Sequence, residues 1–238
     1  KVNGAAVNFA SPGEAIDAGI GMVHQHFMLA PQLTVLENVI LGAEPMKRGN
    51  RIDIAAGKEH LREVGDAYGL TIDPDDLVET LEVGERQRVE IIKVLYRGAK
   101  ILILDEPTAV LVPQEVDELF RNMRELKAAG TTILFIDHKL EEVLEISDTI
   151  TILRQGRTVA TVKPGDVTTA DLAELMVGSE LPTPETTEST VTDEVALNVQ
   201  SLTVLDDDHR PAIDDVSVVV HRGEIVGVAG VEGNGQSE

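Results

Sequence analysis

A short apolar run that ends in two acids and a proline places the strongest constraint on how this chain folds. The run "ILIL" occupies residues 101–104, and Asp105, Glu106 and Pro107 follow it directly. Isoleucine and leucine without polar alternation are typical of a strand that is buried on both faces. Proline lacks an N–H group and ends the hydrogen-bonded ladder. The pattern therefore predicts a fully buried strand whose carboxyl end presents two carboxylates.

A helix and a second apolar strand follow in alternation. The segment from Pro113 to Gly130 is predicted to be a helix. Its apolar face comprises Val116, Leu119, Phe120, Met123 and Leu126. The run "TTILFID" at 131–137 is predicted to be a second buried strand, with His138 at its carboxyl end. Because strands alternating with helices favour a mostly parallel sheet with ligands at the strand ends, we expect His138 to face the same cleft as the two acids.

The rest of the first region adds one strand, an insert and a hairpin. The run "IGMV" at 20–23 predicts a buried strand that ends in a loop containing Gln25. Between residues 33 and 98 the pattern is mostly helical, broken by turns at "PMKRGN" and "TIDPDD", which indicates a helical insert. The segment 149–162 predicts a β-hairpin, and "TTADLAELMVG" predicts a short capped helix.

A polar connector divides the chain. Residues 179–194 contain two prolines with several threonines and glutamates, and nothing to bury. We therefore expect a first domain at 1–178 and a second region at 195–238. The second region is expected to consist of strands, including the run "EIVGVA", that lead into a glycine-rich turn.

Composition excludes several classes of protein. The chain has 42 Asp+Glu against 20 Lys+Arg, a formal net charge of −22, which repels nucleic acid and anionic lipid. Nucleic acid is therefore not an expected partner. The acidity fits an ordinary solvated surface as well as a protein of a high-salt cytoplasm. No apolar run approaches the roughly 20 residues that cross a bilayer, and the absence of cysteine excludes disulfides and thiolate metal sites.

Three further patterns are suited to phosphate chemistry. An Asp–Glu pair at a strand end can hold Mg²⁺ and activate water, although a solvated strand end beside a turn would look the same. The segment "LEVGERQRVEI" at 81–91 places a glycine at the start of a helix, where free N–H groups bind anions, as at any helix cap. The terminal "GVEGNGQSE" fits G-x-x-x-x-G-x-[ST] through Gly230, Gly235 and Ser237, with Gln236 where a phosphate-binding loop has lysine.

In combination and in this order, these segments resemble an ATP-binding cassette ATPase. The glutamine loop is "HQHF", the signature is "LEVGERQRVEI", the second nucleotide motif is "ILILDEPTAVL" and the histidine switch is "FIDHKLEEV". More narrowly, the chain resembles the tandem ATPase subunits of simple-sugar and nucleoside importers. The resemblance implies an α/β P-loop NTPase cassette with a mostly parallel sheet and a helical insert, followed by the β-rich start of a second cassette. On this interpretation the first cassette lacks its own phosphate loop, and the fragment is cut at both ends.

The resemblance also implies roles for particular residues, with ATP and Mg²⁺ as cofactors. Asp105 and Gln25 would contact the metal, Glu106 would be the catalytic base, and His138 would contact the γ-phosphate. The implied nucleotide contacts are Gln25, Val83, Gly84, Glu85, Gly230, Gly233, Asn234, Gly235, Gln236 and Ser237. The implied partners are membrane permease subunits and, indirectly, a substrate-binding protein, at the cytoplasmic face of the membrane.

The sequence departs from the family pattern at one composite site. Cassettes of this family pair head to tail, so that each phosphate loop faces the other cassette's signature. Glu82 stands where serine is usual, and Gln236 and Glu238 replace a lysine and a hydroxyl residue. A carboxylate at about 5 Å opposes each phosphate charge by roughly 3 kcal/mol at an effective dielectric near 20. We therefore expect one competent and one degenerate site. The alternative is a soluble tandem cassette ATPase, such as a ribosome-associated factor, although its connector should be long and its surfaces basic.

Overall fold

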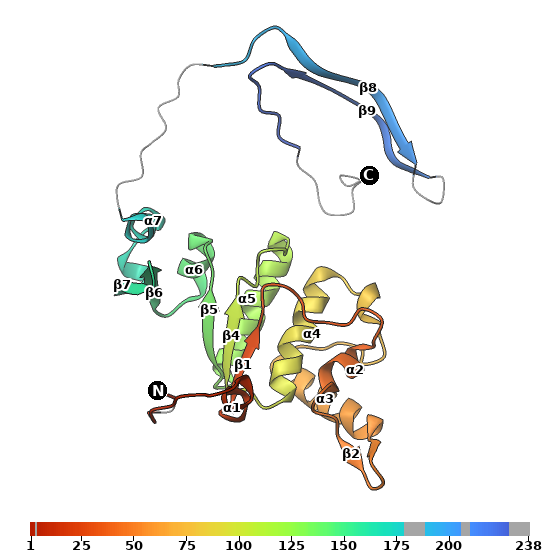
Figure 1. Ribbon diagram of the computed structural model, residues 1–238, viewed down its shortest axis with the longest axis vertical. Coiled ribbons are helices and arrows are strands. Elements are labelled where there is room, and N and C mark those ends of the chain that lie inside the picture. The colour runs from red at the N-terminus through yellow and green to blue at the C-terminus, as the bar shows by residue number, and fades with distance from the viewer. Residues whose placement is uncertain (3, 179–188, 206–209, 229–238) are drawn as a thin grey trace. The chain divides into compact units, whose positions relative to one another are not determined.

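The computed structural model describes residues 1–2, 4–178, 189–205 and 210–228 (Figure 1). The chain divides into two compact units, Lys1–Leu181 and Pro182–Glu238. The division falls within the connector predicted at 179–194. The interpretation of the two units as a first cassette and the start of a second stays a prediction, and each unit is described by itself below.

A three-stranded parallel sheet organises the first unit. Its strands are β1 (Ile20–Val23), β4 (Ile101–Asp105) and β5 (Thr132–Ile136), in the order β1-β4-β5. Val23 lies opposite Leu104, and Asp105 lies opposite Ile136, so the three carboxyl ends meet at one edge. The parallel sheet expected from the alternating pattern is confirmed, and its carboxyl edge gathers the loops that carry the candidate site.

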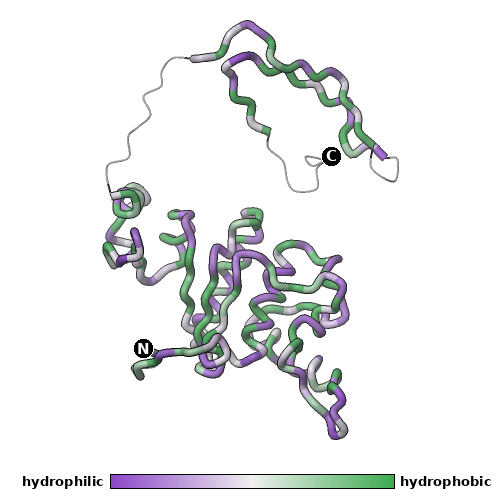
Figure 2. The backbone as a smooth tube through the Cα atoms, viewed as in Figure 1, coloured by the Kyte–Doolittle hydropathy of each residue, from purple (hydrophilic) through white to green (hydrophobic). Residues whose placement is uncertain are grey.

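The first unit also contains helices, some of which pack directly on this sheet. The helices are α1 (Pro12–Asp17), α2 (Val35–Ile40), α3 (Ile54–Tyr68), α4 (Val83–Tyr96), α5 (Pro113–Ala128), α6 (Leu140–Ile146) and α7 (Thr169–Val177), with 3-10 turns at Val78–Thr80 and Pro164–Asp166. Leu102 and Leu104 of β4 share one buried cluster with Ile91 of α4 and Phe120 of α5. Figure 2 shows apolar residues along the strands of this unit. Each fully buried side chain of this kind contributes about 1.5–3 kcal/mol.

The predicted insert is largely helical, with one small hairpin. The segment "PMKRGN" was expected to be a turn, but only its residues 48–50 form one. Its Met46–Lys47 is the strand β2, which pairs antiparallel with β3 (Arg51–Ile52). Gly49 and Asn50 occupy the turn with φ of 89° and 59°, values that glycine and asparagine adopt at least cost.

The side chain of Asn38, in α2, holds the loop that connects the segment of Gln25 to the helical insert. The side chain is 4% exposed. Its Oδ1 atom accepts from the N–H of Ala30 at 2.7 Å, and its Nδ2 atom donates to the carbonyl groups of Ala30, Leu33 and Thr34 at 3.1, 3.4 and 3.0 Å. One amide therefore satisfies the backbone of the whole turn, which fixes how the chain enters α2.

A second small core forms beyond β5. The predicted hairpin is confirmed as β6 (Ile150–Arg154) paired with β7 (Arg157–Val162), and the predicted capped helix is α7. Ile150, Ile152, Val143 and Leu172 make a buried cluster between this hairpin, α6 and α7.

The expectation that β5 is a buried strand is wrong. Leu134 is 53% exposed and Ile136 is 44% exposed. Within the described part of the chain β5 is an edge strand, because β6 pairs with β7 rather than with it. A groove of about 1090 Å³ is lined by residues of β5 and β6, and Leu153 of β6 is exposed as well.

The second unit is a long two-stranded ribbon. Strands β8 (Val195–Leu205) and β9 (Pro211–His221) pair antiparallel with several register shifts, as expected for the two strand-like runs. The run "EIVGVA" does not continue as a strand: residues 224–228 have no regular structure, and Ile225 is 97% exposed. Among the described residues, no helix combines the length and apolarity that crossing a bilayer requires.

Candidate functional site

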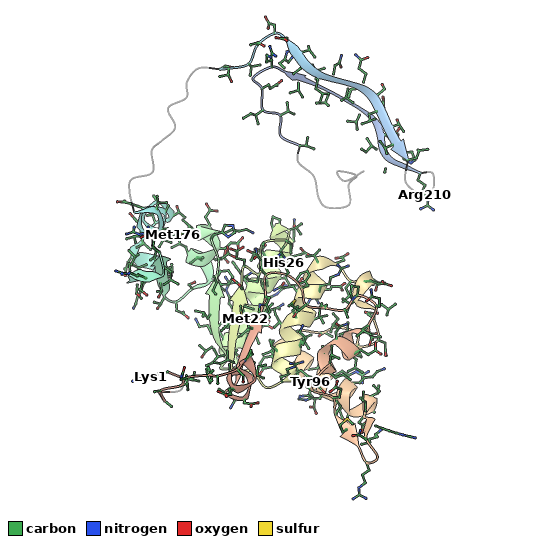
Figure 3. All side chains as sticks on the ribbon, in the orientation of Figure 1. Lys1, Met22, His26, Tyr96, Met176 and Arg210 are labelled. Atoms are coloured by element: carbon green, nitrogen blue, oxygen red, sulfur yellow. The ribbon has the colours of Figure 1, made fainter. Side chains whose placement is uncertain are left out.

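Three strand ends bring Gln25, Glu106 and His138 together. The Nε2 atom of Gln25 donates to Oε2 of Glu106 at 2.8 Å. The Nδ1 atom of His138 lies 3.2 Å from Oε1 of Glu106. Figure 3 labels His26 in the loop after β1, beside Gln25 in sequence and at this end of the sheet. Glu106 of the predicted acid pair therefore contacts both Gln25 and His138.

The backbone at Glu106 explains how one carboxylate reaches both neighbours. Its N–H donates to the carbonyl of Ile136 at 2.9 Å, so the β4–β5 ladder runs one residue beyond Asp105. Its φ is +46°, in the left-handed region. This conformation costs a non-glycine residue roughly 1–2 kcal/mol, and such strain concentrates at functional positions.

A buried carboxylate that the sequence reasoning missed fixes the histidine turn. The side chain of Asp137 is 1% exposed. It accepts hydrogen bonds from the hydroxyl of Thr108 at 2.9 Å and from the N–H groups of His138 and Lys139 at 2.7 and 2.8 Å. The ammonium of Lys139 donates to the carbonyl of Thr108 at 2.8 Å. The turn that carries His138 is thus bound to the loop that follows Glu106, and the acid beside the histidine in "FIDH" was the available signal.

The residues at this edge suit a magnesium ion. Gln25 uses its side-chain nitrogen on Glu106, which leaves its oxygen as an acceptor, and the half-buried Asp105 adds a carboxylate. Mg²⁺ typically takes one or two protein oxygens and completes its shell with water and phosphate. Within the described ranges, no cluster of three or more His, Cys, Asp or Glu side chains could hold a metal ion by itself. The available oxygens therefore fit Mg²⁺ bound together with a phosphate ligand.

The signature segment begins α4, and its N–H groups are not all free. Glu82 is exposed at the N-cap, and its N–H donates to Oε2 of Glu85 at 3.0 Å. The N–H of Gly84 donates to Oε1 of Glu115, from α5, at 2.9 Å. The expectation of free N–H groups at this helix start is wrong for Glu82 and Gly84, whose N–H groups have carboxylate partners. Val83, Gly84 and Glu85 are half-buried, and their role as nucleotide contacts stays a prediction.

The remaining predicted contacts form one glycine-rich segment at the end of the chain. Gly230, Gly233, Asn234, Gly235, Gln236 and Ser237 lie outside the described residues, as does Glu238.

The first unit is a nucleotide-binding α/β domain by its parallel sheet and by the polar groups at the carboxyl edge. Residues 1–109 match the ABC transporter family. The match identifies these residues as part of an ATP-binding cassette, so the family expected from the motifs is confirmed. Membership implies ATP as the nucleotide.

Curated relatives align with the whole chain. It is 45% identical to the nucleoside import ATP-binding protein NupA of Lactococcus lactis, with 100% of this chain and 47% of the relative covered. It is 46% identical to the guanosine import ATP-binding protein NupO of Bacillus subtilis, covering 100% and 46%. It is 44% identical to the glucose import ATP-binding protein TsgD13 of Haloferax volcanii, covering 100% and 48%. The chain therefore spans about half the length of the curated relatives it matches.

Solved structures agree on the fold. CbiO1 from Clostridium perfringens, part of the ABC transporter complex cbiONQ, is 26% identical with a TM-score of 0.55, covering 66% of this chain and 62% of that chain. An ATP-binding cassette of an ABC transporter in its ADP conformation is 25% identical with a TM-score of 0.56, covering 68% and 66%. The predicted α/β cassette fold is confirmed.

Proposed function

We propose that the full-length protein is the ATP-hydrolysing subunit that energises import of a simple sugar or nucleoside through a membrane permease. The observation that carries this proposal is the convergence of Gln25 and His138 on the carboxylate of Glu106. The names of the similar proteins, which are nucleoside, guanosine and glucose import ATP-binding proteins, support the transport role. They do not favour the soluble, ribosome-associated alternative.

The chain's own residues divide the chemistry among them. Glu106 accepts a proton from the water that attacks the γ-phosphate, and Gln25 holds the carboxylate in place. His138 is bound to Glu106 through Nδ1, which leaves Nε2 to contact the phosphate. Asp105 and the oxygen of Gln25 would hold Mg²⁺, which would supply positive charge against the phosphate.

Hydrolysis belongs to one of two composite sites in this proposal. The competent site uses Gln25, Asp105, Glu106 and His138 with a phosphate loop outside this chain. The second site, which we propose to be degenerate, uses the start of α4 with Glu82. The exposed position of Glu82 at the N-cap is compatible with a carboxylate that faces bound phosphate and opposes it.

The proposed partners follow from the transport role. Permease subunits would bind the cassette directly, and a substrate-binding protein would act through the permease, with the subunit peripheral on the cytoplasmic face. The net charge of −22 supports a set of partners without nucleic acid. Co-purification of the full-length protein with a hydrophobic permease tests this arrangement.

Replacement of Glu106 by glutamine in the full-length protein tests the chemistry. Glutamine keeps the size and one acceptor oxygen but removes the base, so ATP turnover should fall by at least about 100-fold while ATP binding persists. Asp117→Asn, an exposed acid on α5, is the matched control and should keep normal turnover. Substantial hydrolysis by Glu106→Gln would refute the assignment and show that the second site turns over ATP.

A further inference from the structure

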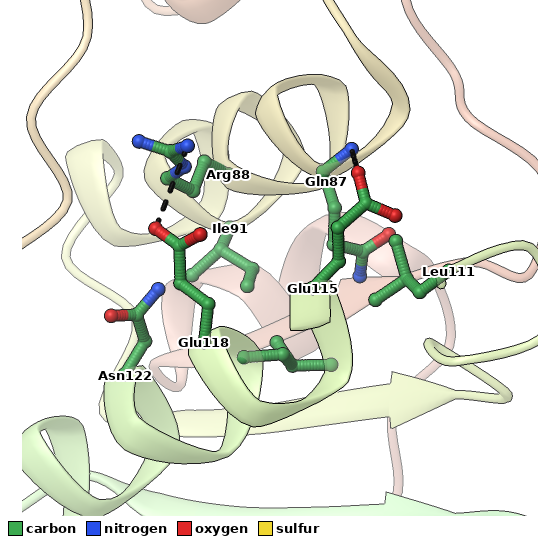
Figure 4. A pocket seen from close by; sticks show the side chains of 9 residues that line it. Gln87, Arg88, Ile91, Leu111, Glu115, Glu118 and Asn122 are labelled. Carbon is green, nitrogen blue, oxygen red and sulfur yellow. Dashed lines mark hydrogen bonds and ion pairs between the residues drawn. The ribbon is translucent and has the colours of Figure 1, made fainter. Parts of the chain in front are cut away.

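Glu115 joins two backbone segments that are far apart in sequence. Its Oε2 atom accepts from the N–H of Val112 at 2.9 Å, at the start of its own helix α5. Its Oε1 atom accepts from the N–H of Gly84 at 2.9 Å, in the first turn of α4. Figure 4 shows the Glu115 side chain reaching from α5 to the beginning of α4. A single carboxylate therefore serves both helix starts, where N–H groups lack partners of their own.

Gly84 is shaped for this contact. A methyl group on its Cα would lie 2.7 Å from Oε1 of Glu115 and 3.1 Å from the Cδ atom. Real side chains do not approach so closely, so only glycine allows the carboxylate to rest on the backbone here. The contact therefore depends on both residues: Glu115 supplies the carboxylate, and Gly84 supplies a backbone that the carboxylate can approach.

Glu115 also holds one end of the loop that carries the catalytic acid. Between Glu106 and Val112 the chain forms a compact turn, in which the N–H of Ala109 donates to the carbonyl of Glu106 at 3.2 Å and the N–H of Leu111 donates to that of Thr108 at 3.3 Å. Thr108 is bound to the histidine turn through Asp137. This loop is therefore anchored on one side to His138 and on the other, through Glu115, to the start of α4.

We propose that Glu115 is a positioning residue that makes the start of α4 and the loop of Glu106 move as one piece. The inference rests on the proposed function and deepens it. In that function the start of α4 belongs to the degenerate composite site, whereas Glu106 belongs to the competent one. Nucleotide that contacts the α4 start would then influence the placement of Glu106 through one carboxylate, without any contact with the hydrolysed ATP.

Glu118 offers a matched comparison on the same pair of helices. It lies one turn further along α5 and pairs with Arg88, one turn further along α4, at 3.5 Å. The two charged groups of this pair both reach water. The backbone group that Arg88 binds is the carbonyl of Thr71, which belongs neither to the α4 start nor to the loop of Glu106. A change at Glu118 therefore alters the charge between α4 and α5 but leaves the loop of Glu106 anchored.

Hydrogen exchange of this chain tests the contact itself. Glutamine at position 115 has one acceptor oxygen where glutamate has two, so one of the two N–H groups loses its partner. In Glu115→Gln, exchange at residues 83–85 or at residue 112 should accelerate about tenfold, the effect of one net hydrogen bond. Glu118→Gln should leave both segments unchanged. Equal protection in the two variants would overturn the proposal.

Turnover by the full-length protein tests the consequence. We expect Glu115→Gln to lower kcat by about tenfold, as for a lost positioning contact, with the KM for ATP nearly unchanged, whereas Glu118→Gln keeps normal kcat. The proposal fails if the two variants have the same kcat, or if lost activity only tracks lost folded protein in circular dichroism. If unchanged protein does not hydrolyse ATP, it is the proposed function that fails, which is a distinct result.

Discussion

Replacing Asn38 should destabilise the first unit by an amount that its hydrogen bonds allow us to estimate. Its three carbonyl partners each keep another donor: Leu33 N–H for Ala30, Val78 N–H for Leu33, and the backbone N–H of Asn38 itself for Thr34. In Asn38→Ala only the N–H of Ala30 is left without a partner. One unsatisfied group of this kind costs about 2 kcal/mol, or roughly 4–8 °C in melting temperature for a unit of this size.

Asn38→Asp should be worse than alanine, although it is closer in shape. The carboxylate can still accept from Ala30, but its second oxygen replaces a donor and faces three carbonyl oxygens. A buried charge without partners costs about 3–5 kcal/mol. Asn122→Ala is the control, because Asn122 is 5% exposed and no side-chain hydrogen bond of it is described.

Thermal and urea unfolding of this chain, followed by circular dichroism, measures the three variants. We expect Asn122→Ala to be the most stable of the three variants, Asn38→Ala to be less stable, and Asn38→Asp to be the least stable. It is refuted if aspartate at position 38 is as stable as alanine, or if neither change at 38 differs from the control.

Two further predictions concern helix starts. Val112 is the N-cap residue of α5 and has extended backbone, but its side chain offers no acceptor to the N–H groups of the first turn. Val112→Thr is nearly equal in shape and adds a hydroxyl acceptor, so it should raise the free energy of unfolding by about 1 kcal/mol. Urea unfolding would measure this change. The backbone N–H and then the hydroxyl of Thr168 hold the pKa of Asp171 below its ordinary value of 3.8. Because the folded state favours the ionised form, this stabilisation is present above pH 3.8 and is lost as the pH falls through the lowered folded pKa. Asp171→Asn should therefore melt lower than unchanged protein at pH 7, and the gap should close in acid; a gap that is constant with pH would contradict it.

Local sequence patterns predicted the elements whose partners are local or repetitive. The apolar face of α5, the hairpin of β6 and β7, and the strand before Asp105 all follow from periodicity and turn residues. The burial of β5 did not follow, because an apolar strand reads the same at the centre of a sheet and at its edge. The run at 224–228 likewise has strand composition but forms no strand, although β8 and β9 lie in the same unit.

The site shows the same division. Gln25, Glu106 and His138 were predicted because each follows a strand end, a local feature that a parallel sheet converts into proximity. Asp137 and Glu115 were missed, because their importance lies in donors 29 and 31 residues away in sequence. Asp137 at least stands beside the predicted His138. The bond between Glu115 and the N–H of Gly84 has no local pattern, so only the folded chain reveals it.

At Glu106 the left-handed backbone lowers the stability of the fold, whereas the proposed chemistry requires the side chain at this position. Glycine would adopt that conformation without the penalty that a side chain brings, yet it would remove the group on which Gln25 and His138 converge. A search for stabilising changes at this position would therefore favour glycine, the substitution that removes the carboxylate from the site.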